Sequence, residues 1–337
     1  MSSPHSILVV GPSWVGDMVM AQSLFIALKQ QTPDCLIDVL APAWSLPLLA
    51  RMPQVRQGIA MPLGHGQFGL SARFRLGRQL QGRYDQAIVL PNSWKSALVP
   101  FFAGIPLRTG YLGELRWGLL NDARRLDKKR LTMTVQRFVA LGLAGDAKLP
   151  PDCPIPQLAI GTEQRQQARE KFSIDAVKKI LALCPGAEYG PAKRWPAEHF
   201  AAVANAKIGE GWQVWLFGSD KDRPVADAIV ELTGGVCRNF VGETTLAEAV
   251  DLLALADAVV SNDSGLMHVA AALDKKIVAV YGSSDPGFTP PLNPAAQILS
   301  LKLACSPCFK RNCPFGHTRC LTELGPAQVL AALEADR

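Results

Sequence analysis

The stretch SILVVGPSWVGDMVMAQSL, residues 6–24, joins an apolar run, a glycine-containing turn and the start of a helical pattern. The run at 6–10 is almost entirely apolar, which is typical of a strand that is buried on both faces. A helix directly after such a strand predicts a parallel sheet covered by helices. Because these sheets hold ligands in the loops that follow their strands, Asp17 is a candidate functional residue.

The same alternation of short apolar runs and helical spacing continues along the chain. Runs with the character of strands are SILVVG, CLIDVLAP, GIAMPL, QAIVLPN and LRTGYL in the first half, and KKILALCPGA, WQVWLFGS, GVCRNFVG, ADAVVSND and KIVAVYG in the second. The Pro-rich stretch 148–157 predicts a linker between the two halves. We therefore expect two α/β domains with mostly parallel sheets, residues 1–160 and 161–337.

Length, composition and charge limit the class of protein. With 337 residues the chain is too long for one ordinary core, and 48% hydrophobic and 19% charged residues are typical of a folded protein. The net charge of +6 is mild and dispersed. It suits an anionic ligand or a membrane surface and does not favour nucleic acid. The apolar runs are too short to span a membrane, and residues 1–11 do not resemble a signal peptide. We expect a cytoplasmic protein, with peripheral membrane attachment left open.

The loop at Asp17 has two interpretations. An acid in the first turn of a helix complements the helix dipole and needs no further role. Alternatively, the carboxylate is held at the end of the first strand, where it can accept a proton. The glycines Gly11 and Gly16 do not match the G-x-G-x-x-G fingerprint, which argues against a dinucleotide-dependent dehydrogenase.

The loop CPGAEYGPAKRWP, residues 184–196, favours an anionic ligand. Gly186 and Gly190 allow close approach of a ligand to the backbone, and Lys193 and Arg194 supply positive charge. A helix is predicted directly after this loop, and free N–H groups together with cations suit a pyrophosphate. The alternative is a basic surface loop.

The loop VSNDSGLMHVAAAL, residues 260–273, also follows a predicted strand. Its first polar residues can simply cap the helix that follows; these are Asn262, Asp263 and Ser264. However, Gly265 leaves the first N–H groups of that helix accessible to a phosphate, and His268 lies one turn further on the side of Ser264. We expect phosphate or ribose contacts here, whereas a packed core histidine is the alternative for His268.

Two further clusters carry chemical groups. The loop FGSDKDRP contains Asp220 and Asp222, whose D-x-D spacing suits a metal–diphosphate or a ribose, although acids in a first helical turn are common. Near the C-terminus, four cysteines could form a structural zinc site, or remain reduced thiols, or form a disulfide; they are Cys305, Cys308, Cys313 and Cys320. The other four are expected to be reduced thiols: Cys35, Cys153, Cys184 and Cys237.

These loops, in this order, resemble the ADP-heptose:lipopolysaccharide heptosyltransferases, and most closely the branch that adds the second heptose of the inner core. The segments that carry the resemblance are GPSWVGDMVMAQSL, DVLAPAWSLPLLARMP, MPLGHG, YDQAIVLPNSWKSALVPFFAGIPLRTGYLGELRWGLLND, CPGAEYGPAKRWP, NDSGLMHVAAAL and VAVYGSSDPGFTPPL. They extend from about residue 7 to residue 292, and the long central match is far more specific than a short glycine pattern.

The resemblance implies the GT-B glycosyltransferase fold, in which two Rossmann-like domains face each other. The N-terminal domain would bind the acceptor, and the C-terminal domain, with its Cys-rich tail, would bind ADP-heptose. Transfer would invert the configuration at the sugar carbon and would need no metal cofactor, with a divalent cation at most stimulatory. Asp17 would take the proton from a hydroxyl of the first heptose of heptosyl-Kdo2-lipid A.

The loop patterns and the resemblance together indicate roles for individual residues. The ADP-heptose site is expected to contain Gly186, Lys193, Asp220, Glu243, Thr244, Asp263, Ser264, Gly265 and His268. Within it, Lys193 and the N–H groups near Ser264 would stabilise the leaving diphosphate. The acceptor site is expected to contain Ser13, Trp14, Asn92, Ser93, Lys95 and Arg116. The acceptor glycolipid is anionic, which fits basic residues in the N-terminal half and peripheral attachment to the inner face of the inner membrane.

Three alternatives remain open at this stage. A heptosyltransferase that acts at a different step or on a different acceptor would have the same fold. A sugar-nucleotide 2-epimerase would need no glycolipid acceptor. A catalytically silent nucleotide-sugar-binding protein would bind the donor without transfer.

Overall fold

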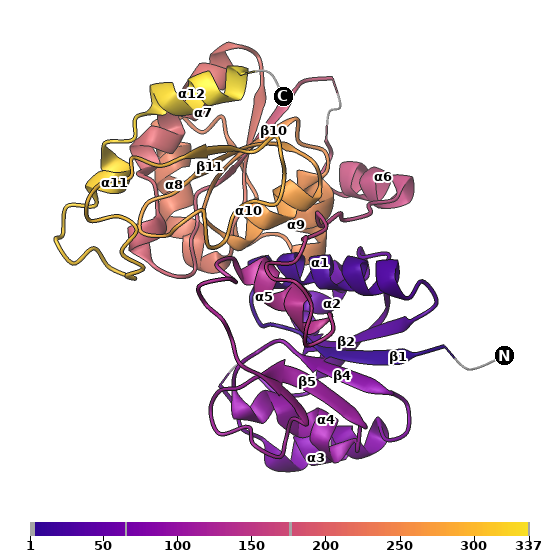
Figure 1. Cartoon of the computed structure of the whole chain (residues 1–337). Coiled ribbons are helices and arrows are strands. Elements are labelled where there is room, and N and C mark those ends of the chain that lie inside the picture. Colours follow the sequence, from indigo (N-terminus) through magenta and orange to yellow (C-terminus); the bar gives the residue numbers. More distant parts are fainter. Residues whose placement is uncertain (1–3, 65, 175–176, 336–337) are drawn as a thin grey trace. The chain divides into compact units, whose positions relative to one another are not determined.

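The computed structural model describes residues 4–64, 66–174 and 177–335, and its chain forms two compact units, Met1–Pro156 and Gln157–Arg337 (Figure 1). The first unit ends at residue 156, four residues before the expected boundary at residue 160. The difference has a local cause, because the Leu158 N–H donates to the Ala272 carbonyl at 2.9 Å and so joins the second unit. The predicted linker at 148–157 contains no helix or strand.

The sheet of the first unit consists of parallel strands in the order β3-β2-β1-β4-β5-β6. Its strands are β1 (Ser6–Val10), β2 (Leu36–Pro42), β3 (Val55–Met61), β4 (Gln86–Val89), β5 (Leu107–Tyr111) and β6 (Asp122–Arg124). The first five confirm the strands expected from the sequence. Because all pairs are parallel, the carboxyl ends of these strands lie at one edge of the sheet.

Helices cover both faces of this sheet, with α1 and α5 over one face and α3 and α4 over the other (Figure 1). The helices are α1 (Val15–Gln31), α2 (Leu46–Leu49), α3 (Leu70–Gln79), α4 (Leu98–Phe102) and α5 (Thr134–Leu141), with 3₁₀ turns η1 (Ala43–Ser45) and η2 (Trp94–Ala97). Alternate residues of β1, Leu8 and Val10, belong to one core cluster with Leu76 of α3 and Val99 of α4. The two-residue alternation of strand side chains therefore gives this sheet two buried faces.

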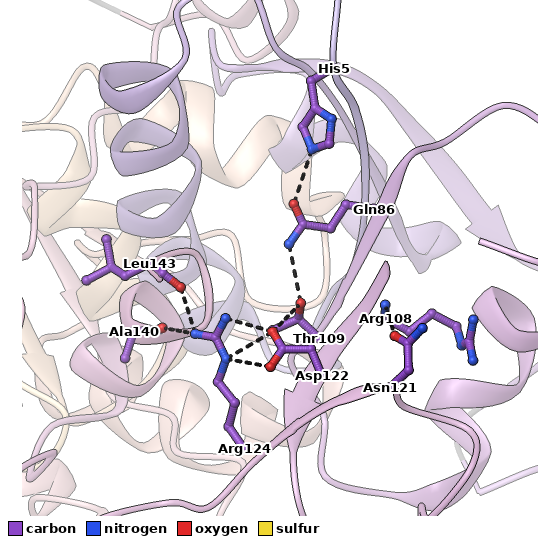
Figure 2. Close-up of polar contacts among 9 residues, drawn as sticks. All are labelled: His5, Gln86, Arg108, Thr109, Asn121, Asp122, Arg124, Ala140 and Leu143. Carbon is purple, nitrogen blue, oxygen red and sulfur yellow. Dashed lines mark hydrogen bonds and ion pairs between the residues drawn. The ribbon is translucent and has the colours of Figure 1, made fainter. Parts of the chain in front are cut away.

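A polar network ties together the strands on one side of the first sheet, as Figure 2 shows. His5 Nε2 lies 3.3 Å from Gln86 Oε1, Gln86 Nε2 donates to Thr109 Oγ1 at 3.3 Å, and Thr109 Oγ1 donates to Asp122 Oδ2 at 3.0 Å. Arg124 extends this network, since its Nη2 donates to Asp122 Oδ2 at 2.7 Å. Its Nη1 also donates to the carbonyls of Ala140 and Leu143, both at 2.8 Å, at the end of α5.

We expect the substitution Arg124→Ala to lower the free energy of unfolding of the first unit by about 2 kcal/mol, because hydrogen bonds from a charged donor to the carbonyls at the end of α5 are lost. Urea unfolding measures this change. The neighbouring exposed Arg125 provides the control, since Arg125→Ala should leave the stability unchanged within about 0.5 kcal/mol. Equal effects of the two substitutions would contradict the structural role of Arg124.

The second unit repeats the plan of the first, with parallel strands in the order β12-β11-β10-β7-β8-β9. Its strands are β7 (Ile180–Cys184), β8 (Gln213–Leu216), β9 (Arg238–Asn239), β10 (Ala258–Asn262), β11 (Lys276–Val280) and β12 (Gln297–Leu299). In both sheets the first and fourth strands of the unit are neighbours, and the strand order reverses between them. Ligands of doubly wound sheets bind at this reversal, beyond the carboxyl ends of the strands.

Helices also cover both faces of the second sheet, with α7, α8 and α12 over one face and α9 and α10 over the other (Figure 1). The helices are α6 (Thr162–Lys171), α7 (Ala197–Gly209), α8 (Arg223–Leu232), α9 (Leu246–Leu253), α10 (Gly265–Ala272), α11 (Arg319–Thr322) and α12 (Pro326–Glu334), with 3₁₀ turns η3 (Pro191–Lys193) and η4 (Asp220–Asp222). Phe200 of α7, Ile229 of α8 and Val329 of α12 share one buried cluster. Among the helices that the structure describes, none has both the length and the apolar character needed to traverse a bilayer.

Candidate active site

The candidate acceptor residues lie where the strand order of the first sheet reverses. Asp17 is in the first turn of α1, directly after β1, and Asn92 lies after β4, the neighbour of β1. Ser13, Trp14 and Asn92 are exposed, whereas Asp17, Ser93 and Lys95 are partly buried. The structure thus supports the placement of these residues at one edge of the sheet. Their contact with an acceptor stays a prediction.

Arg116 differs from the other candidate acceptor residues because its side chain is completely buried. Its guanidinium donates to the Pro91 carbonyl at 2.7 Å, to Asn92 Oδ1 at 3.4 Å and to the Tyr111 carbonyl. Burial lowers the pKa of Arg116. These contacts join the loops after β4 and β5, so Arg116 positions Asn92, and the sequence alone could not distinguish this role from direct contact with an anion.

The donor candidates Lys193 and Asp263 meet in an ion pair. Lys193 Nζ lies 2.5 Å from Asp263 Oδ2, and both side chains are largely buried. Lys193 comes from the loop after β7 and Asp263 from the loop after β10, which are neighbouring strands at the reversal of the second sheet. The Lys193 ammonium also lies 5.1 Å from the centre of the Tyr189 ring. Sequence reasoning missed Tyr189, although it lies within the same loop.

Asn262 anchors the loop that carries Lys193. Its Nδ2 donates to the Pro185 carbonyl at 2.6 Å, and its Oδ1 accepts from the Trp195 N–H at 3.0 Å. The amide is fully buried and so fixes both ends of the loop against the last residue of β10. The sequence offered a helix cap as the simplest role for Asn262, and the structure replaces it with this loop anchor.

The helix α10 begins after Ser264, whose side chain makes no capping hydrogen bond. Instead, Ser264 Oγ lies 3.2 Å from Ser261 Oγ. The capping interpretation of Asn262, Asp263 and Ser264 is therefore wrong, because each side chain has a different partner. The N–H groups at the start of α10, which include that of Gly265, are not used by these side chains.

His268 is buried on α10 beside the ion pair. Burial lowers the pKa of His268 to about 4, an effect that the Asp263 charge opposes and the Lys193 charge strengthens. The imidazole is therefore neutral at neutral pH. This arrangement keeps a second positive charge away from Lys193 and Asp263.

The pKa of His268 makes the stability of the second unit depend on pH. The unfolded chain binds a proton near pH 6.5, whereas folded His268 stays neutral down to about pH 4. Stability should therefore fall by about 3 kcal/mol as the pH drops through this window. Urea unfolding at several pH values tests this expectation against the His268→Gln variant, which should lack this part of the pH dependence. Parallel pH profiles of the two proteins would contradict it.

Asp220 and Asp222 have different environments despite their D-x-D spacing. Asp222 is buried and accepts from the Ser219 N–H at 3.0 Å and from its hydroxyl at 2.9 Å. It also packs on Gly186, where an added Cβ would lie 2.3 Å from the Asp222 Cγ. The absence of a side chain at Gly186 therefore leaves room for the Asp222 carboxylate. Asp220 is exposed and pairs with Arg223 at 3.1 Å.

Glu243 and Thr244 lie near Asp220 because their neighbour Gly242 contacts it. A Cβ on Gly242 would lie 2.3 Å from Asp220 Oδ1, and the Gly242 N–H donates to the Gly218 carbonyl at 3.1 Å. The loops after β8 and β9 therefore meet at this point. Contacts of these residues with ADP-heptose stay a prediction.

The cysteine-rich segment packs against the donor loop. The Arg311 carbonyl accepts from the Ala192 N–H at 3.0 Å, and Tyr189 Oη donates to the Phe309 carbonyl at 2.7 Å. Backbone hydrogen bonds, chiefly from Thr318, lower the pKa of Cys313. Within residues 4–64, 66–174 and 177–335, no group of three or more His, Cys, Asp or Glu is placed to hold a metal ion. The zinc interpretation of Cys305, Cys308, Cys313 and Cys320 gains no support from this geometry.

Known proteins resemble this chain along nearly its whole length. It is 49% identical over 339 residues to lipopolysaccharide heptosyltransferase 2 of Salmonella typhimurium, covering 98% of this chain and 97% of that protein. The protein of the same name from Escherichia coli is 48% identical with the same coverage. Lipooligosaccharide heptosyltransferase 2 of Haemophilus influenzae is 51% identical over 308 residues, or 88% of each chain.

Solved structures support the fold. The structure of E. coli ADP-heptose LPS heptosyltransferase II matches with a TM-score of 0.86 and 46% identity, covering 97% of each chain. The family 9 glycosyltransferase of Veillonella parvula matches with a TM-score of 0.86 at 22% identity, which shows the fold alone. The fold class expected from the sequence, an α/β glycosyltransferase of the GT-B type, is confirmed. The model of glycosyltransferase family 9 (heptosyltransferase) matches residues 73–319, and the chain belongs to this family of enzymes.

Proposed function

We propose that this enzyme transfers L-glycero-D-manno-heptose from ADP-heptose to the first heptose of heptosyl-Kdo2-lipid A, with inversion at the anomeric carbon. The observation that carries this proposal is the 46% identity, over 97% of each chain, to a solved ADP-heptose LPS heptosyltransferase II. The curated relatives named heptosyltransferase 2 support transfer of heptose onto the inner core of lipopolysaccharide.

The Lys193–Asp263 pair suits the donor diphosphate. The ammonium is held within 2.5 Å of one carboxylate oxygen and keeps further N–H donors for a ligand. As the bond from C1 to the diphosphate breaks, negative charge grows on the leaving ADP. Lys193 and the N–H groups at the start of α10 would stabilise this charge, because they are held in place before the reaction starts.

Asp17 is proposed as the general base. The acceptor hydroxyl oxygen forms the new bond to C1, the diphosphate oxygen leaves with the electron pair of the old bond, and the Asp17 carboxylate takes the hydroxyl proton. A carboxylate is a weak base for a sugar hydroxyl, so proton transfer should come late, as the new bond forms. The position of Asp17 directly after β1, at the reversal of strand order, supports this role.

We propose that no metal is required and that a divalent cation is at most stimulatory. Asp222, which could complete a D-x-D metal site, instead holds the Ser219 N–H and hydroxyl. The proposed cellular place is the cytoplasm, peripheral to the inner face of the inner membrane, where the glycolipid acceptor resides. The basic N-terminal unit and the net charge of +6 support attraction to an anionic membrane.

The test is a transfer assay with two acceptors. Purified protein is mixed with ADP-heptose and either Kdo2-lipid A or its heptosylated form, and ADP release is compared with the product mass. A gain of one heptose on the heptosylated acceptor alone supports the proposal. A gain on Kdo2-lipid A alone assigns the enzyme to a different step. Donor binding without ADP release or conversion from either mixture would support the silent-binding alternative, and an epimerised sugar would support the epimerase.

A further inference from the structure

The loops after the first five strands of the first unit each expose one aromatic side chain. These side chains are Trp14 after β1, Trp44 after β2, Phe68 after β3, Trp94 after β4 and Trp117 after β5, with exposed fractions between 41% and 68%. Because the strands are parallel, all five loops leave the sheet at the same edge. Five exposed aromatic rings therefore follow five of the six strands at one edge of the sheet, and such grouping of exposed apolar side chains is typical of a binding surface.

Two of these rings meet although their strands do not. β3 and β4 are separated in the sheet by β2 and β1, yet the ring centres of Phe68 and Trp94 are 5.1 Å apart. Buried Arg73 joins the two loops, since its Nε donates to the Phe68 carbonyl at 2.7 Å and its Nη1 donates to the Lys95 carbonyl at 3.1 Å. The two rings are thus held by a polar anchor beneath them.

The loop after β5, which carries Trp117, is hydrogen-bonded to the loop after β4, which carries Trp94. The Trp94 N–H donates to Glu114 Oε2 at 3.1 Å, and buried Arg116 donates to the Pro91 carbonyl at 2.7 Å. The loops after β3, β4 and β5 therefore form one connected surface. Hydrogen bonds already join the residues that carry Phe68, Trp94 and Trp117, which lowers the conformational entropy that these side chains lose when a ligand binds.

The charge of the first unit suits an anionic ligand. Between Asp38 and Glu114 the sequence contains eight lysines and arginines but a single acid, Asp85. Four of these cations bind groups within the protein, namely Arg51, Arg56, Arg73 and Arg108, whereas Arg75, Arg78 and Arg83 are exposed and Lys95 is partly buried. A polymer of sugar rings that carries phosphates or carboxylates fits both properties. The C–H face of a sugar ring packs flat against an aromatic ring, and its anionic groups are attracted by the excess of cations.

We propose that Trp14, Trp44, Phe68, Trp94 and Trp117 form the surface on which the sugar rings of the anionic acceptor stack. This inference rests on the proposed function and adds to it the residues that recognise the saccharide part of the acceptor. Trp94 is the central member, because its ring contacts Phe68 and its backbone binds the loop after β5.

The experiment separates sugar contact from membrane contact. Calorimetry without ADP-heptose measures binding of heptosyl-Kdo2-lipid A from which the fatty acyl chains have been removed, and kinetics give the KM of each substrate. Trp94→Ala and Trp117→Ala are each expected to weaken acceptor binding by about tenfold and to leave the KM for ADP-heptose unchanged. Trp94→Phe should restore part of the affinity. The control is Phe74→Ala, because the exposed fraction of Phe74, 51%, lies between those of Trp94 and Trp117, but Phe74 lies on α3.

Three results would overturn the proposal. The first is unchanged affinity for the deacylated acceptor in both alanine variants. The second is a loss that occurs only with acylated acceptor in vesicles, which would assign the rings to the bilayer. The third is an equal loss in Phe74→Ala. Because calorimetry needs no catalysis, binding by a parent protein that transfers no heptose would overturn the proposed function and still support this surface.

Discussion

Replacing Asp17 by Asn is expected to slow heptosyl transfer by about 10²- to 10⁴-fold, because the amide cannot take the proton from the acceptor hydroxyl. The loss should appear in kcat, whereas the affinity for ADP-heptose should stay unchanged, since Asp17 belongs to the first unit and the donor candidates to the second. Stopped assays of ADP release together with product mass measure the first quantity, and calorimetry with ADP measures the second.

The same experiment decides between a base and a helix-terminal charge. If Asp17 only complements the dipole of α1, Asp17→Asn should lower the stability by about 0.3–1 kcal/mol and leave the chemical step intact. Asp34, an exposed acid shortly after α1, provides the control, and Asp34→Asn should change neither rate nor stability appreciably. Full activity of Asp17→Asn at saturating substrates would remove Asp17 from the mechanism.

Replacing Lys193 by Met is expected to lower kcat/KM by about 10²- to 10³-fold, because a preorganised charge at the leaving diphosphate is lost while the aliphatic stem is kept. The substitution also leaves Asp263 without its cation. Since the Lys193 charge lowers the pKa of His268 and the Asp263 charge raises it, the His268 pKa should rise above about 4. Initial-rate kinetics and NMR titration of the imidazole measure the two effects.

Lys221 is the matched control for Lys193. The Nζ of Lys221 lies 2.5 Å from Oε1 of Glu188, which belongs to the loop that carries Lys193. The Lys221 side chain, however, is exposed. Exposed pairs contribute little, so Lys221→Met should retain nearly full activity. An equal loss in the two variants would indicate a general effect of loop charge and not a specific contact with the diphosphate.

Much of the fold could be predicted because the long buried strands have a strong sequence pattern. β1, β2, β7, β10 and β11 are largely apolar strands of five to seven residues, and each was expected. β6 and β12 have three residues each, which is too short for a recognisable strand pattern, and β6 also contains Asp122 and Arg124. Their pairing depends on neighbouring strands, which a local pattern does not contain.

The candidate site likewise has features that the sequence predicts and features that only the structure shows. Lys193 and Asp263 lie 70 positions apart in the sequence, yet the rule that ligands bind where strand order reverses brings both loops together. The roles of Arg73 and Arg116 could not be predicted, because arginines are mostly exposed and only three-dimensional contacts show that these two bind backbone carbonyls. The packing of Asp222 on Gly186 was equally hidden, since Gly186 lies 36 positions earlier in the sequence.

The double hydrogen bond of Asn262 has a consequence for protein engineering. Its amide fastens the chain at Pro185 and at Trp195, so the ends of the intervening segment are fixed independently of the residues between them. Libraries for altered nucleotide-sugar preference can therefore vary exposed positions such as Glu188. They should retain Asn262, Gly186 and Lys193, because Gly186 packs on Asp222 and Lys193 pairs with Asp263.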